Sequence, residues 1–115
     1  MLTFETQADG VVVVRLGGSR LDAESAGAVR AKLGEILESE PRVLVLDLGS
    51  VEFMDSTGLG VIISTLRRLP SRSALRICRS QSSITSFFHL TGMDRILSLF
   101  ATEAEAMNAG IGRVV

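Results

Sequence analysis

The sequence contains one cysteine, Cys78, among its 115 residues. A single cysteine excludes a disulfide within the chain and argues against a cysteine-based metal site. No apolar run approaches the length of about 20 residues that crosses a bilayer, and residues 1–5 lack the basic and apolar segments of a signal peptide. We therefore expect a cytoplasmic protein with no metal, no cofactor and no membrane partner.

Concentrated basic charge is also missing. The chain has 12 basic and 13 acidic residues and a net charge of -1. Lys32 is the only lysine, and the arginines are dispersed apart from the adjacent pair Arg67 and Arg68. Because nucleic acids and anionic membranes bind to clustered positive charge, neither is expected as a partner. The length and a hydrophobic fraction of 46% fit one globular domain over residues 1–115.

The N-terminal pattern predicts a hairpin. Residues 2–6 alternate between apolar and polar side chains, and residues 11–16 form a second, mostly apolar run. The turn signal Ala8-Asp9-Gly10 separates them, which is typical of two antiparallel strands. Residues 17–20 are expected to be a loop.

A helix and a buried strand are predicted next. Asp22 is a good helix N-cap, and Pro41 lies just beyond the expected last turn. The apolar residues between them recur at helical spacing: Ala26, Val29, Leu33, Ile36 and Leu37. Residues 43–48 are apolar at five of six positions, which predicts a strand covered on both faces.

The second half of the chain continues this alternation. A helix is expected over residues 56–69, with Asp55 as its cap and with a buried stripe formed by Leu59, Ile62, Ile63 and Leu66. Pro70 to Ser73 break this helix, and residues 74–79 read as a strand. Strands and helices that alternate in this way predict parallel strands joined by right-handed crossovers.

Two further helices are expected near the C-terminus. Ser82 can cap the first of them, which contains Ile84, Phe87, Phe88 and Leu90 and ends before Gly92. A short strand follows over residues 96–100, and Thr102-Glu103-Ala104-Glu105 is a capping box for the last helix. The whole pattern predicts an α/β domain with a mixed sheet: an N-terminal hairpin followed by a β-α-β-α-β-α part.

The segment Met54–Gly60 is the most informative stretch of the sequence. It lies between the buried strand and the second helix, so it puts the Ser56 hydroxyl at the positive end of a helix dipole, where a phosphate is well tolerated. The residues that would make this serine a catalytic nucleophile are missing. Ser56 is therefore interpreted as a modification site on a signalling domain.

The segment Asp55-Ser56-Thr57-Gly58-Leu59-Gly60-Val61, after a strand that ends in Asp47-Leu48, resembles the signature of STAS-domain anti-sigma factor antagonists. Leu21-Asp22-Ala23 and Phe87–Met93 resemble the family in the same order, so the similarity covers essentially the whole chain. The chain departs from many members at Gly18–Asp22. Many members read Gly-x-Leu-Asp there, whereas this chain reads Gly18-Ser19-Arg20-Leu21-Asp22, which is one residue longer and includes Arg20.

This resemblance implies a switch. In the family, the serine after the aspartate is phosphorylated by a partner that is both an anti-sigma factor and a serine kinase, and the resemblance assigns this role to Ser56. The unmodified form binds the partner and frees a sigma factor, which regulates transcription, and a serine phosphatase resets phospho-Ser56. The implied partner surface consists of Asp22, Asp55, Ser56, Thr57, Gly58, Leu59 and Gly60, and no residue is expected to be catalytic.

Local chemistry gives the same residues second interpretations. A serine in a first helical turn can simply satisfy free backbone amides, and Thr57 is a rival phosphate acceptor. Asp55 and Asp22 also read as plain helix caps. Gly58 and Gly60 would admit a partner's backbone, or would let the start of the helix pack tightly on the sheet.

Three other functions compete with the switch. A receiver domain would carry its phosphate on Asp47, but the acidic pair and the lysine that it needs are not at the expected positions. A serine hydrolase would need a nucleophile elbow and a histidine near Ser56, whereas the only histidine, His89, falls in the third predicted helix. The third is a STAS domain that scaffolds a signalling complex or senses a ligand without sigma-factor control.

Overall fold

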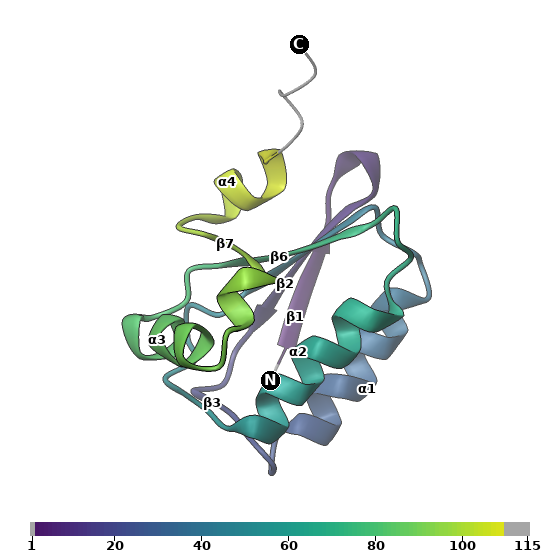
Figure 1. Ribbon diagram of the computed structural model, residues 1–115. Coiled ribbons are helices and arrows are strands. Elements are labelled where there is room, and N and C mark those ends of the chain that lie inside the picture. The colour runs from purple at the N-terminus through teal and green to yellow at the C-terminus, as the bar shows by residue number, and fades with distance from the viewer. Residues whose placement is uncertain (1, 110–115) are drawn as a thin grey trace.

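The computed structural model describes residues 2–109, which are built around a five-stranded mixed sheet (Figure 1). The strands lie in the order β1 (Leu2–Thr6), β2 (Val11–Leu16), β4 (Val43–Asp47), β6 (Ala74–Cys78) and β7 (Ser98–Phe100). β1 is antiparallel to β2, and the remaining neighbours are parallel. The predicted hairpin and the mixed α/β sheet are confirmed.

The helices form layers on both faces of this sheet. They are α1 (Ala26–Leu37), α2 (Ser56–Arg68), α3 (Ser82–Leu90) and α4 (Glu103–Asn108). Figure 1 shows α1 and α2 side by side against one face, while α4 packs on the other. The first three helices each join one parallel strand to the next, as the alternating pattern predicts. Within residues 2–109, no helix is long and apolar enough to span a bilayer.

Alternate residues of the central strands face two separate cores. In β2 and β4, Val12, Val14, Leu44 and Leu46 belong to the main core, together with residues of α1, α2 and α3. The intervening residues form a smaller core with Ala106 of α4: Val11, Val13, Val43, Val45 and Cys78. Because both faces are covered, residues 43–48 are all buried, which confirms the predicted burial of this strand.

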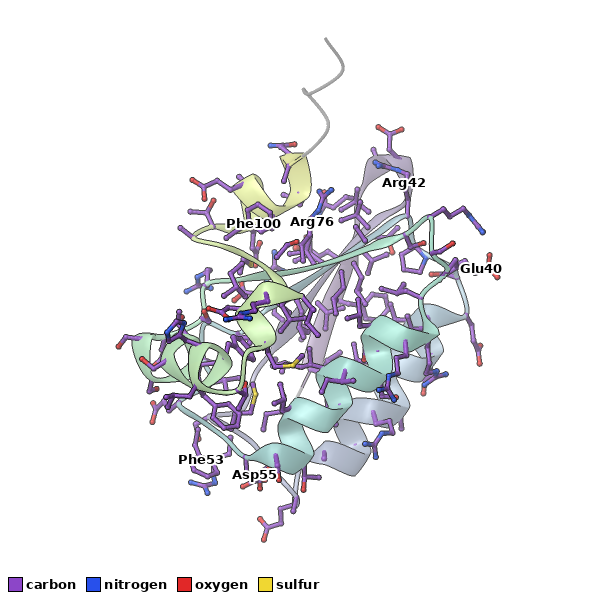
Figure 2. The ribbon with its side chains drawn as sticks, viewed as in Figure 1. Glu40, Arg42, Phe53, Asp55, Arg76 and Phe100 are labelled. Carbon is purple, nitrogen blue, oxygen red and sulfur yellow. The ribbon has the colours of Figure 1, made fainter. Side chains whose placement is uncertain are left out.

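The hairpin turn lies at one end of the molecule. Asp9 and Gly10 adopt positive φ angles of 63° and 74°, and Arg42 holds the turn through an Nε hydrogen bond to the Asp9 carbonyl oxygen at 2.9 Å. Figure 2 shows Arg42 at this end and Asp55 at the opposite end. The start of α2 is therefore remote from the hairpin turn.

Helix α1 begins three residues later than the predicted cap at Asp22 implies. Residues 23–25 form a turn, and the Asp22 backbone carbonyl accepts hydrogen bonds from the backbone N–H groups of Ser25 and Ala26. Asp22 therefore caps this turn, and Ser25 occupies the helix N-cap position without a side-chain cap. The predicted buried residues of α1 are all buried, because the helical spacing is unaffected by the shift.

The small parallel sheet formed by β3 (Arg20–Leu21) and β5 (Phe53–Met54) corrects the prediction that Arg20 lies in a loop. Strands of two residues are too short to display a hydrophobic period, so the sequence gives no signal for them. The pairing places Arg20 opposite Phe53 and Leu21 opposite Met54. This sheet ties the segment before α1 to the segment before α2.

The buried stripe of α2 also differs from the prediction. Leu59 and Ile62 are buried as expected, but Val61 and Thr65 replace Ile63 and Leu66, which are only partly buried. The buried Thr65 hydroxyl donates to the Val61 carbonyl oxygen at 2.8 Å, so this buried polar group is satisfied. A helix that contacts both the sheet and a neighbouring helix buries a wider arc than one stripe predicts.

The C-terminal elements are present with shifted boundaries. Helix α3 has Gln81 rather than Ser82 at its N-cap, and Leu90 is exposed. Gly92 has a φ of 75°, as the predicted helix stop requires. A 3-10 turn at Met93–Arg95 delays the last strand until Ser98.

One of the two hydrogen bonds expected for the capping box of α4 is formed as predicted, and the other has a different donor. The Thr102 hydroxyl accepts from the Glu105 backbone N–H at 3.0 Å. The Glu105 carboxylate accepts from the Ala101 N–H rather than from Thr102. The capping-box pattern therefore locates the start of this helix correctly.

Candidate functional site

The start of α2 presents two hydroxyl groups to solvent. Asp55 is the N-cap, and its Oδ1 accepts from the Gly58 backbone N–H at 2.9 Å, which confirms the predicted cap. Ser56 and Thr57 are exposed in the first turn. Within residues 2–109, neither side-chain hydroxyl forms a hydrogen bond. Capping is thus done by Asp55, which leaves the Ser56 oxygen accessible and without a local structural task.

Asp55 also joins this turn to the segment before α1. Its second oxygen, Oδ2, accepts from the Ala23 backbone N–H at 3.3 Å, and its own backbone N–H donates to the Leu21 carbonyl oxygen at 3.4 Å. Both carboxylate oxygens therefore accept backbone N–H groups, one from each side of the junction. The side chain fixes the relative position of two segments that lie 32 residues apart.

Asp22 is brought to the same junction but is occupied by local partners. Its Oδ1 accepts from the backbone N–H groups of Glu24 and Ser25 at 3.1 and 3.2 Å. Its Oδ2 accepts from Arg20 Nε at 2.8 Å. The hydrogen bond from Arg20 lowers the pKa of the Asp22 carboxyl, so this residue is ionised at neutral pH.

Arg20 is a site residue to which the sequence analysis assigned no role. Its guanidinium lies 4.3 Å from the centroid of the Phe53 ring, across the β3–β5 pair. It lines an open hollow of about 340 Å³ together with Asp22, Ala23, Glu24 and Asp55. The only sequence signal was that Arg20 stands in the segment that departs from the Gly-x-Leu-Asp pattern.

The two glycines of the motif differ in their surroundings. A Cβ atom on Gly58 would overlap the backbone carbonyl of Leu21, whereas a Cβ on Gly60 would meet nothing within 4 Å. Gly58 is required for the close packing of α2 on the Leu21 segment, and Leu59 is buried in the main core. Of the motif residues, Ser56, Thr57 and the partly buried Gly60 are thus the ones left for a partner to reach most directly.

A second cluster of charges lies on the α4 face of the sheet, and no local sequence pattern predicts it. Asp47, at the end of β4, is buried and pairs with Arg79 at 3.1 Å. Arg15, at the same end of β2, makes two hydrogen bonds to Glu103 of α4, at 2.6 and 2.8 Å. These residues are spread over 88 positions, so only the parallel register of the strands brings them together.

The titration of this cluster follows from its burial and its hydrogen bonds. Burial, followed by a hydrogen bond with Glu103, raises the pKa of the Asp47 carboxyl. The hydrogen bond from Arg15 lowers the pKa of Glu103 to about 2. Burial, reinforced by the nearby carboxylates, raises the pKa of the Cys78 thiol to about 12. Glu103 is therefore ionised at neutral pH, and Cys78 remains a neutral thiol.

The residues that rival functions would need are engaged elsewhere. His89 is an exposed residue of α3 and pairs with Asp94 at 2.8 Å, so it is committed to that contact rather than to Ser56. Asp47 is enclosed and paired with Arg79, unlike an accessible phosphate acceptor. Among residues 2–109, no three histidine, cysteine or carboxylate side chains are grouped as a metal site would require.

The arrangement of these elements matches a known domain family. The model of the STAS domain matches residues 5–106. The chain belongs to the STAS domain family. The exposed start of α2, the Asp55 cap and the paired Asp22 segment are thus features of this STAS domain.

Several relatives of this STAS domain are named anti-sigma factor antagonists. The chain is 31% identical over 99 residues to the anti-sigma-F factor antagonist RsfB of Mycobacterium tuberculosis, which covers 86% of this chain and 80% of RsfB. The crystal structure of an anti-sigma factor antagonist from Mycobacterium paratuberculosis has a TM-score of 0.83 at 29% identity and covers 95% of this chain and 93% of the other. The Bacillus protein SpoIIAA in its phosphorylated form has a TM-score of 0.70 at 24% identity over 94% of this chain and 97% of the other, which shows a shared fold.

Proposed function

We propose that this STAS domain is an anti-sigma factor antagonist whose binding is switched by phosphorylation of Ser56. The observation that carries the proposal is the state of the Ser56 hydroxyl, which is exposed and lacks a hydrogen bond to any residue of the described range. The names of the relatives supply the class of partner, an anti-sigma factor. The whole chain, residues 1–115, acts as one STAS domain.

The modifying enzyme is the partner itself, an anti-sigma factor with serine kinase activity. The kinase transfers the γ-phosphoryl group of ATP to Ser56 Oγ, the hydroxyl proton passes to a base of the kinase, and ADP leaves. This chain supplies the acceptor and no catalytic group. It functions as a binding protein rather than as an enzyme, and it works in the cytoplasm alongside its sigma-factor pathway.

The added phosphate changes binding rather than folding. A phosphoserine carries a charge of about -1.5 to -2 at neutral pH. At the first residue of α2 this charge is favoured by the helix dipole, by about 0.3–1 kcal/mol at an exposed position. The domain therefore stays folded, and the cost falls on the partner, which must desolvate a dianion in its interface.

The cycle has two states. Unmodified Ser56 allows the antagonist to bind the anti-sigma factor, so the sigma factor is released. Phosphorylated Ser56 prevents binding, and a serine phosphatase restores the active form. The partner contacts Ser56 and Thr57 directly, while Asp55 and Gly58 hold the turn in place.

The test is phosphorylation with the candidate kinase. The chain is incubated with the anti-sigma factor from the same genome and ATP, and the modified residue is mapped by mass spectrometry. Label is expected on Ser56, should disappear in Ser56→Ala, and should persist in the matched variant Thr57→Ala. Label on Thr57 in the parent chain, or no label on either residue, would overturn the assignment.

A further inference from the structure

Arg20 is the only cationic side chain among the residues that line the hollow beside the start of α2. The same hollow is lined by three carboxylates, those of Asp22, Glu24 and Asp55. This local excess of negative charge exists before any phosphate is added. Ser56 directly follows Asp55, so a dianion on Ser56 would add negative charge next to a hollow whose lining residues include one cation, Arg20.

Only part of the Arg20 guanidinium is in use. Its Nε donates to Asp22 Oδ2 at 2.8 Å, and its flat face rests on the Phe53 ring. Its two terminal amino groups donate to no residue within the range 2–109. The side chain is 59% exposed, so it can change partners without disturbing the core.

The register of the small sheet pairs Arg20 with the segment that leads into the modified turn, and the Arg20 side chain lines the same hollow as Asp55, the residue before Ser56. Arg20 pairs with Phe53, and two residues later the Asp22–Ala23 backbone meets the Asp55 carboxylate. A guanidinium forms paired hydrogen bonds with phosphate, and these are stronger than a single bond to a carboxylate. Phe53 provides a platform on which the guanidinium can turn while it remains stacked.

We propose that Arg20 is the internal binding group for the phosphoryl group on Ser56, and that it leaves Asp22 when it binds the phosphate. The inference rests on the proposed function in one respect, that Ser56 is the modified residue. Its consequence is that a single modification alters two points of the partner surface. Ser56 gains a dianion, and Asp22 Oδ2 loses its hydrogen bond from Arg20 and becomes available to another donor, while Asp22 Oδ1 keeps its backbone donors.

The experiment uses the full chain with phosphoserine encoded genetically at position 56, so that no kinase is needed. The second pKa of the phosphoserine is measured by 31P NMR in the Arg20 parent, in Arg20→Gln and in Arg20→Lys. The control is Arg67→Gln, which removes an exposed arginine from the far end of the same helix. The pKa is expected to be lower in the parent than in Arg20→Gln by about 0.5 unit, as one exposed opposite charge near the phosphate predicts.

The control and the lysine variant separate a specific contact from general charge. Arg67→Gln should leave the phosphoserine pKa at the parent value, and Arg20→Lys should lie between the parent and Arg20→Gln. Equal pKa values in the parent and Arg20→Gln would overturn the proposal. If Arg20→Gln does not fold, the chemical shift of the Arg20 Nε–H group is compared between the serine and phosphoserine forms of the unsubstituted chain. The proposal requires this chemical shift to change, and an unchanged value would overturn it.

Failure of this inference and failure of the proposed function are distinguishable. A chain that no kinase labels on Ser56 would refute the proposed function and leave the NMR comparison intact. If a kinase labels Ser56 but the phosphoserine pKa is the same in the parent and in Arg20→Gln, only the role of Arg20 is refuted.

Discussion

The backbone carbonyl of Leu21 occupies the space that a Cβ atom on Gly58 would need. Leu21 belongs to β3 and Gly58 to the first turn of α2, so this contact presses the modified turn against the segment that carries Asp22. The Asp55 carboxylate bridges the same two segments through the backbone N–H groups of Gly58 and Ala23. The position of Ser56 is thus set by backbone packing and by one side chain.

Gly58→Ala should destabilise the fold, whereas Gly60→Ala should stabilise it. The new methyl group at position 58 overlaps a backbone carbonyl, and such overpacking costs about 2 kcal/mol or more. At position 60 there is open space, and alanine in a helix is favoured over glycine by about 0.5–1 kcal/mol. Urea denaturation of the two variants measures both changes. Equal effects of the two substitutions would contradict the close approach of Leu21.

Ser56→Glu should leave the free energy of unfolding within about 1 kcal/mol of the parent, because a negative charge at the start of a helix is mildly favourable. The same substitution should abolish binding to the anti-sigma factor, while Ser56→Ala should bind constitutively. Calorimetry with the purified partner measures the affinities, and thermal denaturation measures the stability. A Ser56→Glu chain that binds as tightly as Ser56→Ala would argue against a charge-based switch.

Glu103 makes the stability of the domain sensitive to acid. Its pKa is lowered from 4.5 to about 2 by Arg15, so its contribution is present above pH 4.5 and is lost as the pH falls toward 2. Between pH 5 and pH 3 the parent should lose about 1–2 kcal/mol more than Glu103→Gln. The raised pKa of Asp47 acts in the opposite direction, because its protonated form is favoured at low pH, and it offsets part of this loss.

Urea denaturation of the parent and Glu103→Gln at the two pH values measures this difference. Glu38→Gln is the matched control, because Glu38 is an exposed glutamate with no ion pair among the described residues. The control should keep the full acid dependence of the parent. An identical pH profile for the parent and Glu103→Gln would show that the Arg15 contact does not hold α4.

Cys78 should report on the docking of α4. The thiol is fully buried in the smaller core, and its pKa is raised to about 12, so it reacts only when the helix opens. Ala106→Asp places a charge in that core and should accelerate labelling by a thiol reagent at least about tenfold, which corresponds to a loss of about 1.4 kcal/mol from the closed state. Ala104→Asp, at an exposed position of the same helix, should label at the parent rate. Equal rates for both variants would place the barrier to labelling outside α4.

Long, periodic segments could be predicted from the sequence, whereas contacts between distant segments could not. The buried residues of α1 and the strand at residues 43–48 follow from spacing and composition, and the cap at Asp55 follows from local hydrogen-bonding chemistry. The β3–β5 pair has no period to detect, and it is this pair that brings Arg20 to Phe53.

The charged cluster under α4 was beyond sequence reasoning for a related reason. Asp47 and Glu103 are ordinary residues of a strand end and a first helical turn. Only the parallel register of β2, β4 and β6 makes neighbours of Arg15, Asp47 and Arg79. Which strands pair depends on the packing of the whole domain, so the pairing cannot be predicted from a local sequence pattern.

The separation between the hairpin turn at Ala8–Gly10 and the start of α2 has a practical consequence (Figure 2). Exposed turns of this kind tolerate insertions and attached groups well. A fluorophore or a biotin fixed there would anchor the molecule to a sensor surface with Ser56 pointing into solution. Each of the affinity comparisons could then be read from immobilised protein without masking the turn under study.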